Sequence, residues 1–205
     1  MRIATMATGG IGGYLALKLS IAGFEVATIA RDSHLAAIKE NGLALDGPNG
    51  CEKAYPWLAT DNPSKVGAVD VIIFGVKCGA LEPAAEACKP MLKERTIVVP
   101  FLNGVETVER LQKILPQENI ANGVAKISTT IKAPGVIHQT GDFRTFVFAE
   151  CDNRPSTRIK ALQEAITKAG AIAPETADIE KEMWSKFIMF SAISGATAAG
   201  RCTLG

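Results

Sequence analysis

The segment Ala7-Thr8-Gly9-Gly10-Ile11-Gly12-Gly13 decides the fold of this chain. It follows a short apolar run, Arg2 to Met6, and precedes a run with apolar residues at helical spacing that extends to Ala22. A strand, a glycine-rich turn and a helix in this order are typical of dinucleotide binding. Glycines let the backbone turn sharply and bring bare N–H groups up to a pyrophosphate.

We therefore predict a cofactor-binding turn, made by Ala7, Thr8, Gly9, Gly10, Ile11 and Gly12. The usual first glycine of such a turn is an alanine here, which predicts a slightly altered backbone. A glycine-rich turn that holds no ligand is the alternative interpretation.

The composition is that of an ordinary globular protein, with 47% hydrophobic and 21% charged residues. A net charge of +1 and the lack of a basic stripe argue against a nucleic-acid or membrane-surface partner. No apolar run reaches transmembrane length, and a strand directly after Met1 leaves no room for a signal peptide. We expect a cytoplasmic protein.

The cysteines predict no disulfide framework and no metal site. They are five in number, scattered and without a C-x-x-C pair, and the chain has only two histidines to join them. Free thiols in a reducing compartment are the expected state.

Strand and helix patterns alternate through the first half of the chain, which predicts a doubly wound, mostly parallel α/β sheet of the Rossmann type. Further strands are expected at Glu25–Ala30, Val69–Val76 and Thr96–Pro100, and helices at His34–Asn41, from about Pro83, and at Val105–Leu115. Residues Leu43 to Ala59 predict a hairpin excursion, because Asp46-Gly47-Pro48-Asn49-Gly50 lies between two extended arms.

The pattern changes after residue 120. Three strands are expected at Val124–Ile131, Val136–Gln139 and Arg144–Ala149, with turns at Ala133-Pro134-Gly135 and Gly141-Asp142, and they would extend the sheet with antiparallel or mixed pairing. A helix follows from Pro155 to Ala169, and another begins near Asp178. We predict a dinucleotide-binding domain over residues 1–176 and the start of a helical substrate or dimerisation domain over 177–205.

The end of the second expected strand distinguishes the two nicotinamide cofactors. A carboxylate there would accept from the ribose 2′-OH of NAD, whereas this strand ends at Arg31, whose guanidinium can pair with a 2′-phosphate. The prediction is NADP(H), with Asp32 as a cap of the next helix. A solvated surface charge is the alternative interpretation of Arg31.

Polar residues also follow the next two strands. Lys77 comes after the third strand and Asn103 after the fourth, where open α/β sheets bind ligands. A lysine can contact a phosphate, a ribose or a substrate acid, and an asparagine offers both a donor and an acceptor. We expect both to contact the cofactor, although a surface lysine and an ordinary Asx turn remain alternatives.

Several further motifs occur along the whole chain. They are Gly9-Gly10-Ile11-Gly12-Gly13-Tyr14, Ala30-Arg31, Val76-Lys77, Asn103-Gly104-Val105-Glu106, Ser128 through Pro134-Gly135-Val136 to Thr140-Gly141, Glu182-Met183-Trp184-Ser185-Lys186-Phe187, and Thr203-Leu204-Gly205. Together these motifs resemble the ketopantoate reductase (2-dehydropantoate 2-reductase) family.

The resemblance implies NADPH-dependent reduction of ketopantoate to pantoate, a step of pantothenate biosynthesis, with a small 2-keto acid as partner and a homodimer through the helical domain. It implies that Lys186 is the catalytic residue beside the keto group, that Asn103 lies at the active site and that Arg31 selects NADPH. An ammonium group at that point would stabilise the negative charge that develops on the carbonyl oxygen. Trp184, two residues earlier, is expected to pack in the core.

Two positions depart from the family. Asparagines are usual four and eight residues after the catalytic lysine, and this chain has Phe190 and Ser194. They keep open a related dehydrogenase acting on a polyol or an amino-acid conjugate. A third hypothesis is a non-catalytic NADP-binding module. The presence of Lys186 argues against it.

Overall fold

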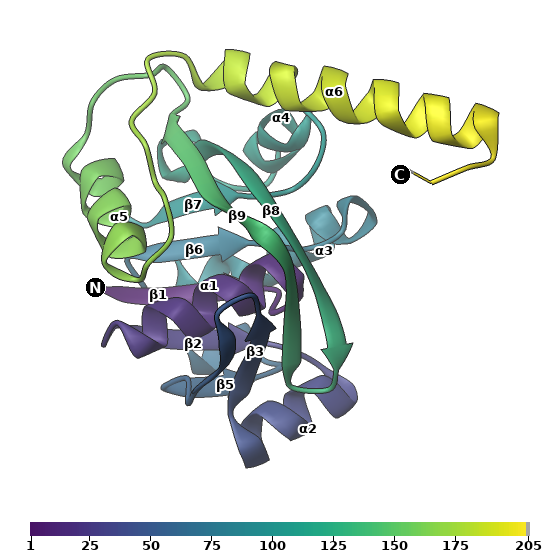
Figure 1. Cartoon of the computed structure of the whole chain (residues 1–205). Helices are drawn as coiled ribbons and strands as arrows, with labels where there is room; N and C mark the ends of the chain where they lie inside the picture. The colour runs from purple at the N-terminus through teal and green to yellow at the C-terminus, as the bar shows by residue number, and fades with distance from the viewer. Residues whose placement is uncertain (204–205) are drawn as a thin grey trace.

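The computed structural model describes residues 1–203, so Leu204 and Gly205 of the last family motif lie outside the described residues. A five-stranded parallel sheet forms its centre (Figure 1). Its strands are β1 (Arg2–Met6), β2 (Glu25–Ile29), β5 (Leu58–Thr60), β6 (Val71–Phe74) and β7 (Ile97–Pro100), in the order β5-β2-β1-β6-β7. The prediction of a doubly wound, mostly parallel α/β sheet is confirmed.

Helices cover both faces of this sheet. They are α1 (Gly10–Ile21), α2 (Asp32–Asn41), α3 (Leu81–Cys88), α4 (Thr107–Gln112) and α5 (Thr157–Lys168). The side chains of α1 are buried all round, from Tyr14 to Leu19 except for Lys18. A helix that is apolar on every side needs cover on every side, and a second sheet covers the side that faces away from the parallel sheet.

The second sheet has four strands in the order β4-β3-β9-β8. They are β3 (Leu43–Gly47), β4 (Gly50–Ala54), β8 (Ala121–Ala133) and β9 (Val136–Glu150). The predicted hairpin between residues 43 and 59 is confirmed as the β3–β4 pair. The prediction that the later strands extend the first sheet is wrong: β9 pairs with β3, and β8 pairs with β9. The apolar face of these strands is buried against α1, where Phe146 stacks on Tyr14 with ring centroids 5.9 Å apart.

A turn at Gly141-Asp142 is also absent from the described chain, because β9 continues through this segment. The pairing of β9 with β8 shifts register here, so residues 141–144 form a bulge. The Gln139 amide holds the bulge by donating to the carbonyls of Gly141 (3.1 Å) and Phe143 (3.3 Å). The other predicted turn, before Val136, is confirmed, and Gly135 adopts the positive φ of +75° that the turn needs.

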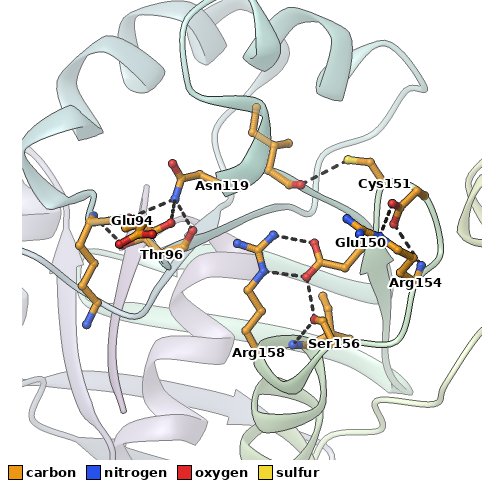
Figure 2. A network of polar contacts seen from close by, with 12 residues as sticks. Glu94, Thr96, Asn119, Glu150, Cys151, Arg154, Ser156 and Arg158 are labelled. Atoms are coloured by element: carbon orange, nitrogen blue, oxygen red, sulfur yellow. Dashed lines mark hydrogen bonds and ion pairs between the residues drawn. The ribbon is translucent and has the colours of Figure 1, made fainter.

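A polar network ties the end of β9 to α5 at the amino-terminal edge of the parallel sheet (Figure 2). Glu150 accepts hydrogen bonds from Arg158 (2.6 and 2.7 Å) and from Ser156 (2.6 Å), which also caps α5. Burial raises the pKa of Glu150, but the bonds from Arg158 and Ser156 outweigh it and hold the pKa below its ordinary value. The network lies at the start of β6 and β7, whereas the glycine-rich turn follows the end of β1.

The last helix, α6 (Ile179–Gly200), is more exposed than the others. Asp178 caps it by accepting from the Lys181 N–H (2.9 Å), and within the described residues its only buried side chains are Ile179 and Met183. The rest of α6 projects beyond the sheets (Figure 1). The prediction that Trp184 packs in the core is therefore wrong: it is 44% exposed. Among residues 1–203, no helix has both the length and the apolar character needed to cross a membrane.

Candidate nucleotide and substrate site

The order of the parallel strands places a crevice beside the glycine-rich turn. The chain leaves β1 toward β2 in one direction and β6 toward β7 in the other, and ligands of open α/β sheets bind where the direction changes. A cavity of about 530 Å³ lies there, which we call the switch-point cavity. Its lining includes Ala7, Thr8, Gly9, Arg31, His34 and Lys77.

Gly9 is the position in the turn that is open to this cavity. It is the N-cap of α1, and a Cβ added there would find its nearest atom, the Gly75 carbonyl oxygen, at 3.8 Å. Gly10, Ile11 and Gly12 form the first turn of α1, whose N–H groups have no partner inside the helix and carry the positive end of its dipole. An anion at this end of α1 is therefore stabilised.

The other glycines of the motif are required by internal packing. A Cβ on Gly10 would lie 2.5 Å from the Thr129 carbonyl oxygen, and one on Gly13 would lie 2.6 Å from Ile137. A Cβ on Gly12 would overlap the Ala7 carbonyl oxygen. The hairpin of β8 and β9 crosses the start of α1, so Gly10 and Gly13 pack closely against this hairpin as well.

Arg31 and Lys77 both lie on the rim of the switch-point cavity, and both are exposed. Lys77 directly precedes a 3-10 turn, Cys78–Ala80. Arg31 is the N-cap of α2, and the prediction that Asp32 caps this helix is wrong. Asp32 is the first residue of the helix, with a φ of +50°, and the N-cap makes no side-chain hydrogen bond.

The residues of the cavity fit an anionic dinucleotide. Two cationic side chains and the N-terminus of α1 face one space, and within residues 1–203 no carboxylate lines it. The Thr129 hydroxyl, which lies over Gly10, is buried and has no hydrogen-bond partner in this part of the chain.

A second cavity, of about 380 Å³, lies between the end of β7 and α6. We call it the α6 cavity; its lining includes Asn103, Gly104, Val124, Lys186, Phe190 and Ser194. The Lys186 ammonium donates to the Ala125 carbonyl oxygen (2.7 Å) and lies 5.5 Å from the centre of the Phe190 ring.

Burial lowers the pKa of Lys186, and the charge of Lys126 lowers it further. Lys126 itself pairs with Glu182 of α6 at 2.7 Å. Lys186 is therefore a half-buried ammonium with a weakened hold on its proton, at the edge of an apolar cavity.

The sequence-predicted residues thus fall into two groups. Ala7, Thr8, Gly9, Arg31 and Lys77 share the switch-point cavity, and Asn103 and Lys186 share the α6 cavity. Gly10, Ile11 and Gly12 line neither cavity and instead form the start of α1. The two groups are neighbours, because the Cys78 thiol donates to the Asn103 carbonyl oxygen (3.3 Å) and joins the loops after β6 and β7.

Sequence reasoning missed His34, which lines the switch-point cavity. Its ring bonds the Thr8 carbonyl oxygen (2.9 Å) and accepts from the Gly135 N–H (3.0 Å). Its spacing was the available signal, because a residue three positions after Arg31 lies on the same side of a helix.

Comparison with known proteins agrees with this arrangement. The family model for ketopantoate reductase PanE/ApbA matches residues 3–153. A 2-dehydropantoate 2-reductase of Mesorhizobium japonicum is 34% identical, over 97% of this chain and 69% of its own length. The crystal structure of 2-dehydropantoate 2-reductase from Porphyromonas gingivalis superposes with a TM-score of 0.95 at 33% identity, over 99% of this chain and 73% of that one.

A D-mandelate dehydrogenase, solved with NADH and anilino(oxo)acetate, is also similar, with a TM-score of 0.81 at 26% identity, over 91% of this chain and 60% of that one. The chain spans about two thirds of the length of these relatives. On the family match and the identity to its relatives, the chain belongs to the ketopantoate reductase PanE/ApbA family.

Proposed function

We propose that the protein reduces a small 2-keto acid with NADPH, and that 2-dehydropantoate, the substrate named for several relatives, is the first candidate. One observation carries this proposal: a cavity with two cations at the start of a helix adjoins a cavity that holds a half-buried lysine. The first is suited to an anionic dinucleotide and the second to a carbonyl that gains negative charge.

The cofactor role divides among residues of the switch-point cavity. The pyrophosphate would be held by Gly9 and the first turn of α1, a 2′-phosphate by Arg31, and a ribose or phosphate by Lys77. NADPH, when bound, supplies the hydride. We propose NADPH over NADH because the guanidinium of Arg31 can form a bidentate pair with a phosphate.

Lys186 is proposed as the catalytic residue. Its ammonium would stabilise the negative charge that develops on the keto oxygen and donate a proton to that oxygen. The lowered pKa makes this donation easier at neutral pH. Asn103, at the opposite wall of the α6 cavity, would orient the substrate or the nicotinamide with its amide.

The division into residues 1–176 for the nucleotide and 177–205 for the start of a helical domain remains part of the proposal. The exposed apolar side chains of α6 support it, since Phe187, Ile188 and Met189 are each more than a third exposed. We propose that the helical domain completes the α6 cavity and forms a homodimer, and that the protein acts in the cytoplasm.

A second candidate is a related dehydrogenase with another substrate, which Phe190 favours because an aromatic ring in the α6 cavity offers no hydrogen bond to a hydroxyl or carboxylate. The test is an assay of the full gene product, following NADPH and NADH absorbance with 2-dehydropantoate and with 2-keto acids that lack its hydroxyl. The leading proposal expects the fastest oxidation of NADPH with 2-dehydropantoate. Faster turnover of another carbonyl compound would favour the second candidate, and binding of NADPH without reduction of any would leave a non-catalytic binding module.

A further inference from the structure

We propose that His34 is a positioning residue that sets the glycine-rich turn for the dinucleotide, a role that rests on the NADP(H) site proposed above. The side chain comes from the first turn of α2 and meets the turn between β1 and α1 inside the switch-point cavity. It contacts the backbone of two segments that are distant in sequence, at Thr8 and Gly135.

The hydrogen bonds define the tautomer of His34. The Gly135 N–H donates to Nδ1 at 3.0 Å, so Nδ1 carries a lone pair. The proton of the neutral ring is therefore on Nε2, which donates to the Thr8 carbonyl oxygen at 2.9 Å. Nε2 therefore bonds the glycine-rich turn, and Nδ1 bonds the tip of the β8–β9 hairpin.

With the hydrogen bond from His34, every polar group of the buried residue Thr8 has a partner. The Thr8 N–H donates to the Ile29 carbonyl oxygen (2.8 Å), and its hydroxyl lies 3.0 Å from the Thr5 hydroxyl. The carbonyl is the remaining polar group, and His34 is its partner. Loss of that donor would leave a buried acceptor unpaired, which the turn would relieve by rotating the peptide.

Rotation of this peptide would matter because it carries the Gly9 N–H. In a trans peptide the carbonyl and the N–H point in opposite directions, so fixing the Thr8 oxygen on His34 also fixes the direction of the Gly9 N–H. Gly9 is the open position of the turn, directly before the first turn of α1. His34 therefore presets a donor for a phosphate without touching the phosphate itself.

Two conservative variants separate the two bonds. In His34→Gln, the longer side chain places an amide N–H near the position of Nε2 and can still donate to Thr8. In His34→Asn, the shorter side chain places an amide oxygen near the position of Nδ1 and can still accept from Gly135. The proposal expects His34→Gln to keep NADPH affinity within about threefold of the wild type and His34→Asn to weaken it at least about tenfold, since tenfold corresponds to about 1.4 kcal/mol.

The measurement is the NADPH dissociation constant, by fluorescence or calorimetric titration without substrate, beside a thermal unfolding curve for each variant. His138→Gln is the matched control: it is the other histidine of the chain, bonds Asp46 at 3.1 Å and does not line the switch-point cavity. Its NADPH affinity is expected to equal that of the wild type.

The outcomes are distinguishable. A wild-type protein that binds neither NADPH nor NADH overturns the proposed function and this role with it. A wild-type protein that binds NADPH, with folded Gln and Asn variants of equal affinity, overturns the role of His34 alone. If the Asn variant does not unfold cooperatively, the Gln variant still decides, because a tenfold loss of affinity in that folded variant contradicts the proposal.

Discussion

The two cavities of this protein are built in opposite ways. The switch-point cavity is lined by the ends of buried strands and by the start of α1, a helix enclosed between two sheets. The α6 cavity has the loop after β7 on one side and, on the other, a helix whose only buried side chains within residues 1–203 are Ile179 and Met183. The core therefore preforms the half of the site proposed for the nucleotide, whereas the half proposed for chemistry rests on one exposed helix.

The strongest test of the preformed half is a pair of glycine variants. Gly12→Val would force a side chain onto the Ala7 carbonyl oxygen, and overpacking of about 3 kcal/mol would lower the melting temperature by roughly 6–12 °C. Gly9→Val has room in the fold but fills the cavity, so it is expected to abolish NADPH binding while circular dichroism stays unchanged. Equal melting temperatures for the two variants would show that the turn is not held as rigidly as the packing implies.

The second test addresses the exposed half. Lys186→Ala is expected to lower kcat by about a hundredfold or more, the scale of losing one preorganised donor. NADPH affinity should stay nearly unchanged, because Lys186 lies in the α6 cavity and not in the switch-point cavity. Single-turnover hydride transfer in the full gene product measures the first effect and a binding titration the second. Lys186→Arg should rescue poorly, and undiminished transfer in the alanine variant would return Lys186 to a structural role.

The third test concerns the rim of the switch-point cavity. Arg31→Ala should weaken NADPH binding by about tenfold or more, since a charge-assisted hydrogen bond contributes roughly 1.5–3 kcal/mol. NADH binding should change little, because NADH lacks the 2′-phosphate. Dissociation constants of both cofactors for wild type and variant measure the effect. A wild-type protein with equal affinity for the two cofactors would contradict the assignment of Arg31.

The smallest expected effect is a pH dependence of stability. Burial lowers the pKa of His34 and outweighs its bond to Thr8, so the folded state favours the neutral ring. The unfolded chain then binds the proton more readily, and stability falls as the pH drops below 6.5, the ordinary value. Melting curves between pH 7.5 and 5.5 should show this slope in the wild type and a shallower one in His34→Gln.

Local sequence was enough to predict the parallel half of the fold. The turn from Ala7 to Gly13 identified β1 and α1. The carboxyl ends of parallel strands lie at one edge of the sheet, so Arg31 after β2 and Lys77 after β6 line one cavity on either side of β1. Lys77 and Asn103, which follow neighbouring strands and were both expected to contact the cofactor, line different cavities. Asn103 was predicted from its position at a strand end as well as by resemblance, Lys186 by resemblance alone, and the structure puts both at one cavity.

The sequence did not predict which strands pair, or which residues far apart in the chain contact one another. Alternation identified the apolar residues of β8 and β9, but it does not say which sheet a strand joins, and these two strands form a second sheet with β3 and β4 instead of extending the first. The partner of Gly10 is Thr129 and one partner of His34 is Gly135, each about a hundred residues away. The exposure of Trp184 has a different reason. Helical spacing predicts a helix but does not predict whether that helix packs on the core along its whole length.

The enclosure of α1 between two sheets has a consequence for how the protein folds. The inner face of this helix rests on strands that are complete by residue 100, but its outer face meets Phe146 and Ile137, which are synthesised much later. We therefore expect that the βαβ units of the first hundred residues do not fold on their own. Closure of the core requires contacts of high sequence separation, which are typical of slow-folding topologies. We therefore expect the residues around the glycine-rich turn to reach their stable form during synthesis only after the β8–β9 hairpin has left the ribosome.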